Sequence, residues 1–237
     1  MSTTATYLPR ATTRDKRLSP PRAYGRYAIA LRLRDAVVSL TERAVSGRTG
    51  QRLLDLGCGD MPYRPLLTGI VGSYEGADLP GNSAAKYHML EDGTTTAPAG
   101  AADVVLSSQV LEHVRRVPAY LREARRVLAP GGRLVLTTHG AWVYHADPHD
   151  YWRWTAEGLR ETLADEGFEV THLRGLLGLM PLGLQMVQDG VVRKLPKPLR
   201  NPTCFMFQQA ILLADRLHTD QDREHNACVY GLIATRR

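Results

Sequence analysis

The sequence is poor in cysteine and in long apolar runs, and both shortages exclude classes of protein. Its three cysteines, Cys58, Cys204 and Cys228, are too widely spaced for a disulfide framework or a metal-binding motif. No apolar run approaches the roughly 18 residues that span a bilayer, and the N-terminal segment lacks the apolar core of a signal peptide. These absences predict a cytoplasmic protein without a membrane partner.

The positive charge is confined to one end of the chain. The formal charge is +6, and residues 1–35 carry the whole excess, because basic and acidic residues balance in the remainder. A nucleic-acid enzyme is expected to have a basic cleft with aromatic residues that stack on bases. We therefore predict a small-molecule partner and no nucleic acid, with residues 2–23 forming a solvated tail.

The run 52–60 predicts a buried strand that ends in a ligand-binding turn. Its leucines suit a strand, and Gly57 and Gly59 allow a ligand to approach the backbone. Pro62 is expected to open the following helix. A dinucleotide fingerprint would need a third glycine where Pro62 stands, so an NAD-linked oxidoreductase is the less favoured reading.

Two acids follow later predicted strands. Asp78 ends the strand 74–79, about twenty residues after the glycines, where nucleoside-binding α/β folds place an acid on the ribose hydroxyls. Asp92 ends a third strand and is our candidate for the adenine amino group. The Asp92-Gly93 pair is also a common turn signal.

These patterns resemble motifs of the class I, Rossmann-like methyltransferases that depend on S-adenosylmethionine (SAM), in particular the type 11-like group. Asp55, Gly57 and Gly59 match the first motif, D/E-x-G-x-G-x-G, and Met61 replaces its last glycine. The series V-L-E-H-V, helix, L-x-P-G-G and apolar strand completes a resemblance that covers residues 50–172. The resemblance implies an α/β fold with a Rossmann-like, seven-stranded doubly wound sheet. It also implies SAM as cofactor and S-adenosylhomocysteine as product.

The cofactor-binding residues that we expect lie at the ends of the first four strands and at the V-L-E-H-V segment. They are Asp55, Gly57, Cys58, Gly59, Asp78, Leu79, Asp92, Gly93, Ser108, Gln109 and His113.

The predicted organisation has an N-terminal arm with a capping helix, residues 1–45, before a methyltransferase domain, residues 46–237. The domain contains a lid loop, residues 139–154, and a helical insertion before the last strand, residues 175–220. Five apolar residues of the insertion suit core packing, an acceptor pocket or the surface of a homodimer. They are Met180, Met186, Phe205, Met206 and Phe207.

The lid is the richest segment in chemistry, and it follows a strand whose end faces the cofactor in this fold. We expect a histidine to act as general base, because its pKa lies near neutrality. The catalytic candidates are His145 and His149, Asp147 or Asp150 as the group that orients an imidazole, and Tyr24. The expected substrate-binding residues are Tyr27, His139, Trp142, Tyr144, Tyr151, Trp152 and Arg153. The alternative for Arg153 is an ion pair with Asp150. A metal held by His139, His145, His149 and Asp147 is a less favoured alternative, and we predict none.

The sequence thus predicts a SAM-dependent methyltransferase of bacterial specialised metabolism. The aromatic lid favours a phenol or indole acceptor, methylated on oxygen, nitrogen or carbon. The segment 148–155, P-H-D-Y-W-R-W-T, resembles lids of methyltransferases linked to sugar pathways, so a sugar or surface-glycan precursor is the alternative. The alternatives from outside the methyltransferases are the nucleotide-linked oxidoreductase and a non-catalytic SAM-binding protein.

Overall fold

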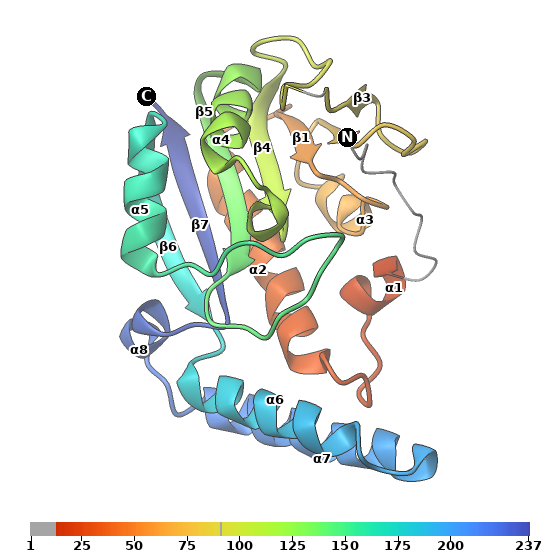
Figure 1. Ribbon diagram of the computed structural model, residues 1–237. Coiled ribbons are helices and arrows are strands. Elements are labelled where there is room, and N and C mark those ends of the chain that lie inside the picture. Colours follow the sequence, from red (N-terminus) through yellow and green to blue (C-terminus); the bar gives the residue numbers. More distant parts are fainter. Residues whose placement is uncertain (1–12, 91) are drawn as a thin grey trace.

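The centre of the protein is a seven-stranded mixed sheet, seen in a computed structural model that describes residues 13–90 and 92–237 (Figure 1). The strand order is β3-β2-β1-β4-β5-β7-β6. The first five strands run parallel, and β7 runs antiparallel to both of its neighbours. The predicted α/β, Rossmann-like seven-stranded fold is confirmed. The strands are β1 (Arg52–Leu56), β2 (Ser73–Asp78), β3 (Tyr87–His88), β4 (Ala102–Ser108), β5 (Leu128–His139), β6 (Phe168–Leu176) and β7 (Val229–Arg236).

Helices cover both faces of this sheet. Successive side chains of a strand point to opposite faces, so Leu53 of β1 packs in the core cluster of α2 and Leu54 in the cluster of α4 and α5. The predicted alternation of strand and helix therefore produces two buried layers. The helices are α1 (Thr13–Leu18), α2 (Tyr27–Val45), α3 (Arg64–Leu67), the 3-10 helix η1 (Leu111–His113), α4 (Val117–Val127), α5 (Ala156–Asp165), α6 (Leu179–Val192), α7 (Lys197–Asp215) and α8 (Asp220–His225).

The topology decides where a ligand can bind. The strand β1 lies between β2 and β4. The chain adds β2 and β3 on one side of β1 and then β4 and β5 on the other, so the strand order reverses at β1. Open α/β sheets bind ligands at the carboxyl ends of the strands beside such a reversal. The residues after β1, β2 and β4 converge on this edge.

The N-terminal arm differs from the predicted tail. From residue 13 it forms α1, which packs on α2, and the Arg34 guanidinium donates to the carbonyl of Leu18 at 2.9 Å. The part of the arm before residue 13 lies outside the described residues. The arm therefore contributes structure next to the site.

The helix after the glycine turn also differs. It begins at Arg64 rather than at Pro62, with Pro65 in its first turn. The chain first makes another turn, in which the Arg64 amide donates to the Met61 carbonyl at 3.2 Å. The turn uses the residues that were expected to start the helix.

The helical insertion forms an antiparallel pair, α6 and α7, below the sheet in Figure 1. The strand β6 continues to Leu176, so the first helix of the insertion, which was predicted from residue 175, begins at Leu179. In the described part of the chain, no helix combines the length and hydropathy needed to cross a membrane.

Candidate active site

The turn after β1 has the backbone that a cofactor cradle requires. Gly57 has φ of 82°, and a Cβ there would lie 2.6 Å from a methyl group of Val110, so only glycine fits. Gly59 has φ of 54°, and a Cβ there would meet no atom within 4 Å, because the residue borders an open cavity. Gly57 thus allows close packing against Val110, and Gly59 leaves open space on the wall of the cavity.

Met61 occupies the position of the missing third glycine in the motif. Its φ of 49° lies in the left-handed region that glycine favours, and its amide donates to the Cys58 carbonyl at 2.8 Å. The side chain is buried, so packing compensates for the conformational cost. The turn keeps the expected backbone path without its last glycine.

Asp78 closes the turn from the neighbouring strand. Its Oδ2 accepts hydrogen bonds from the Gly59 amide and the Asn82 side chain, both at 2.7 Å, and Oδ1 accepts from the Leu79 amide at 2.8 Å. The carboxylate is 8% exposed and borders the cavity. Each oxygen can accept more than one hydrogen bond, so Oδ1 retains capacity for a ligand hydroxyl. Sequence reasoning missed Asn82.

Asp55 lies below this turn and does not line the cavity. Burial raises the pKa of its carboxyl to about 7, although the hydroxyl of Tyr74 donates a hydrogen bond to it, which acts in the opposite direction. The side chain of Asp55 therefore supports the end of the strand. Its position does not favour direct contact with a cofactor.

This buried acid predicts a pH-dependent stability. In the unfolded chain the carboxyl of Asp55 ionises near 3.9, so the contribution is fully present below about pH 4 and is lost as the pH rises through about 7. Asp55→Asn keeps an acceptor for Tyr74 and removes the ionisation. Across this window we expect wild type to lose on the order of 4 kcal/mol of unfolding free energy relative to the variant. Urea unfolding of both proteins across the pH range measures the difference, and parallel curves would contradict it.

A cavity of about 410 Å³ opens at the strand ends beside the turn. Such a volume is typical of small-molecule sites. It brings together eight expected cofactor residues: Gly57, Cys58, Gly59, Asp78, Leu79, Ser108, Gln109 and His113. Of the expected catalytic residues it includes His145 and Asp147. The lining residues that sequence reasoning missed are Arg17, Asp60, Met89, Val110, Val114 and Pro148.

These walls fit SAM. Asp78 presents a carboxylate for ribose hydroxyls, and the open side of Gly59 leaves room beside the backbone. Leu79 and Met89 supply apolar surface suited to the adenine ring of SAM. Arg17 supplies the positive charge that pairs with its methionine carboxylate. The buried thiol of Cys58 has a raised pKa, which argues against a nucleophilic role.

Asp92 and Gly93 lie away from this cavity. Asp92 is exposed, and its Oδ1 accepts hydrogen bonds from the amide and hydroxyl of Thr94 at 2.9 and 2.6 Å. Gly93 has φ of 90° in the same turn. The turn signal in the sequence describes this pair better than the adenine contact does.

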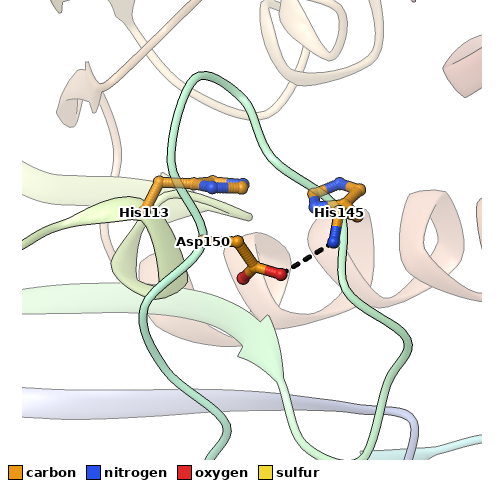
Figure 2. Close-up of side chains that lie close together, drawn as sticks. All are labelled: His113, His145 and Asp150. Carbon is orange, nitrogen blue, oxygen red and sulfur yellow. Dashed lines mark hydrogen bonds between the residues drawn. The ribbon is translucent and has the colours of Figure 1, made fainter.

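The lid brings His145 against His113, and both residues line the cavity. Their rings stack with centroids 5.0 Å apart (Figure 2). Nδ1 of His113 is bonded to the carbonyl of His149, which leaves Nε2 as its free position. His145 is exposed on the lid, but partial desolvation of its ring, followed by the nearby His113, lowers its pKa. The His145 imidazole is therefore neutral at pH 7.

Asp150 does not orient an imidazole, which corrects one expectation. Its Oδ2 accepts from the backbone amide of His145 at 2.8 Å (Figure 2). Both of its oxygens also accept from the Arg153 guanidinium, at 2.5 and 2.6 Å. The Arg153 guanidinium lowers the pKa of Asp150 to about 2, against the effect of burial. Arg153 also donates to the carbonyls of Trp142 and Val143. The pair fixes the shape of the lid.

His113, His145 and Asp150 form a group of potential metal ligands. His113, His145 and Asp150 place one potential ligand atom each within 4.8 Å of one another. Asp150 is already neutralised by Arg153, whose positive charge would stand beside a bound cation. The ion pair of Asp150 with Arg153 therefore does not favour a cation at this place.

His139 lies beneath the lid and does not line the cavity, but its ring meets the ring of His145 edge-on, with centroids 5.2 Å apart. It is 5% exposed, its ring stacks on Trp142 with centroids 5.3 Å apart, and Nε2 lies 3.6 Å from Oε1 of Glu112. Burial lowers the pKa of His139 to about 3 and raises that of Glu112. This buried pair supports the lid from below, because the Glu112 carbonyl also accepts from the amides of Tyr151 and Trp152.

The other expected acceptor and catalytic residues do not line the cavity. Tyr144 is 78% exposed, and Tyr151 and Trp152 are exposed on the lid. The indole of Trp152 donates to the Val114 carbonyl at 2.8 Å, which anchors the lid. The remaining residues away from the cavity lining are His149, Tyr24, Tyr27, Trp142 and Arg153.

Comparisons with known proteins agree with this geometry. A family model described as a methyltransferase domain matches residues 25–173. A ubiquinone biosynthesis O-methyltransferase of Cereibacter sphaeroides is 39% identical over 102 residues, which are 38% of this chain and 41% of that protein. One of a Caulobacter species is 30% identical over 128 residues, or 45% and 49% of the two chains. The chain thus spans less than half the length of these curated relatives.

Solved structures share the fold. A SAM-dependent methyltransferase from Aquifex aeolicus aligns with a TM-score of 0.56 at 15% identity, covering 98% of this chain and 100% of the other. A geranyl diphosphate C-methyltransferase from Streptomyces coelicolor aligns with a TM-score of 0.56 at 16% identity, covering 90% and 81%. The family model covers well over half of the chain and includes the glycine turn, Asp78 and the lid. The protein therefore belongs to the methyltransferase domain family, the class I SAM-dependent methyltransferases.

Proposed function

We propose that this protein transfers a methyl group to the hydroxyl of a small phenolic acceptor, with His145 as general base. The observation that carries the proposal is the neutral imidazole of His145 on the wall of the cavity that Asp78 and the glycine turn define. When bound, SAM supplies a methyl group that its sulfonium makes electrophilic. The chain's own residues then align the acceptor, exclude water and remove the hydroxyl proton.

The base is assigned by position and protonation. A base must be unprotonated to accept a proton, and the lowered pKa keeps His145 in that state at neutral pH. His113 stacks on it and has its own Nδ1 occupied, so it can hold the His145 ring in place. His149 lies outside the cavity lining and is the weaker candidate.

Oxygen is the acceptor atom that the curated relatives support, because their printed names are O-methyltransferases of ubiquinone biosynthesis. A role in specialised metabolism stays a prediction without support from those names. A cytoplasmic location belongs to the same proposal, since all three cysteines are free and buried. Indoles and nucleotide sugars remain the alternative acceptors, and both enter the test.

An acceptor screen with isotope-labelled SAM tests the proposal. We expect label in catechols or phenols, on oxygen, and little in indoles or nucleotide sugars. Mass spectrometry of the products locates the added methyl group. Transfer mainly to a nucleotide sugar would replace the acceptor class, and SAM binding without transfer to any class would favour the non-catalytic alternative.

A further inference from the structure

The segment 179–217, which contains the helix pair α6 and α7 and the two residues after it, has an unusual distribution of polarity. Ten of the fifteen large apolar side chains that stand exposed in the described ranges belong to it. In a surface helix of a water-soluble protein, the apolar stripe normally faces the core. Here the outward stripe is apolar.

The outward face of α6 repeats at helical spacing. Leu179, Met180, Met186, Val187 and Val191 are all exposed, and Gly183 and Gly190 lie between them. No charged residue interrupts this face before residue 193. The face therefore offers a continuous apolar strip to its surroundings.

The inward face of α6 carries buried glutamines beside Pro181 and Leu182, and their hydrogen bonds fix it in place. The side-chain amides of Gln185, Gln188 and Gln208 all donate to the carbonyl of Gly25, at 3.1, 2.9 and 3.1 Å. Asp189 forms two hydrogen bonds with Arg26, at 2.6 and 2.8 Å. Rotation of the helix would break these buried bonds, so the apolar strip cannot turn inward.

The helix α7 repeats the arrangement. Its most exposed apolar residues are Met206 at 70% and Leu213 at 64%, and Leu199 and Phe205 are exposed too. Leu217, just after the helix, is 73% exposed. Ordinary core packing, expected for the apolar residues of this insertion, is wrong for Met180, Met186, Phe205 and Met206.

The exposed charge on the pair has one sign. Four basic residues stand together where α6 turns into α7: Arg193, Lys194, Lys197 and Arg200. The acids of the segment are engaged in ion pairs: the half-buried Asp189 with Arg26, and the buried Asp215 with Arg32 and Arg223. Among the described residues, this surface therefore presents apolar groups and positive charge together.

We propose that α6 and α7 dock on an anionic phospholipid surface, as a peripheral contact and not as a span. Apolar side chains that enter the boundary between headgroups and acyl chains, next to basic residues that meet lipid phosphates, provide the two contributions that interfacial binding uses. A second copy of this chain would bring its own basic residues to this face, and positive charge does not complement positive charge. The expectation of no membrane partner rested on the absence of a spanning segment, which leaves such an interfacial contact open.

Vesicle flotation tests the proposal with the full-length protein. The probes are vesicles of phosphatidylcholine alone and of equal parts phosphatidylcholine and phosphatidylglycerol. We expect tight binding to the anionic vesicles, weaker binding to the neutral ones, and weakening by salt. The variant R193Q/K194Q/K197Q/R200Q should lose roughly fivefold in affinity for each basic residue removed.

Two further variants make the result specific. R22Q/R43Q/R48Q/R64Q removes the same charge from exposed positions of the body and should keep anionic binding. V187D/M206D changes two exposed apolar residues and should lose binding to both kinds of vesicle. Retained SAM affinity and far-UV circular dichroism show that each variant folds.

Two results would overturn the proposal. One is an equal loss of binding in R193Q/K194Q/K197Q/R200Q and in R22Q/R43Q/R48Q/R64Q, which would mean that the total charge, and not the helix pair, determines binding. The other is a protein that ignores both vesicles and is a dimer by light scattering, with V187D/M206D monomeric, which would make the face a contact between copies.

Discussion

Asp78→Ala is expected to weaken SAM binding by about a hundredfold or more. The substitution removes an acceptor for the ribose hydroxyls and also leaves the Gly59 amide and the Asn82 side chain without their partner. A hydrogen bond to a charged group contributes about 1.5–3 kcal/mol, and an unsatisfied buried donor adds a penalty of similar size. Calorimetric titration with SAM measures the change.

The matched control is Asp92→Ala. Asp92 is an acid after a neighbouring strand, but it is exposed and bonded to Thr94 outside the cavity. We expect SAM affinity within about twofold of wild type, since surface changes away from special features have small effects. A large loss in Asp92→Ala with little loss in Asp78→Ala would reverse our assignment of the two acids.

His145→Gln is expected to lower kcat by about 10² to 10⁴, the usual contribution of a positioned general base. Glutamine retains a polar side chain but cannot accept the proton. SAM affinity should change far less than kcat, because the imidazole is assigned to the acceptor. His149→Gln is the control and should remain within a few-fold of wild type, since His149 lies outside the cavity lining.

The pH dependence of kcat/KM separates a base from a structural role. The unprotonated form of His145 is active, so the rate falls as the pH falls through its pKa, which lies below the ordinary value of 6.5. This acid limb should vanish in His145→Gln. Assays of wild type in EDTA complete the test, because activity lost on chelation and restored by a divalent ion would assign His145 to a metal instead.

Local patterns predicted most of the fold. The leucines of β1 face both layers, and the glycines leave the strand where the sheet order reverses, so the cavity edge follows from sequence spacing. Asp78 was predictable for the same reason. Met61 shows the limit of a motif, because a methionine adopts the left-handed turn that the pattern assigns to glycine.

The rest depends on contacts between distant segments. Arg17 reaches the cavity because α1 packs on α2, and nothing in its basic, proline-rich surroundings indicates this. The spacing left Asp150 two roles, orienting an imidazole or pairing with Arg153, and only the fold shows the ion pair with Arg153. The aromatic residues of the lid gave a strong substrate signal, but their rings anchor the loop or stand exposed. Side-chain partners across a loop cannot be read from spacing alone.

The most direct test of the central claim is calorimetric titration of the wild-type protein with SAM and, separately, with NADH. The cavity of Asp78, the two glycines and Arg17 predicts micromolar binding of SAM, with none of NADH, whose pyrophosphate the turn at residues 57–62 does not suit. Absence of SAM binding, or tighter binding of NADH, would contradict the assignment of this site.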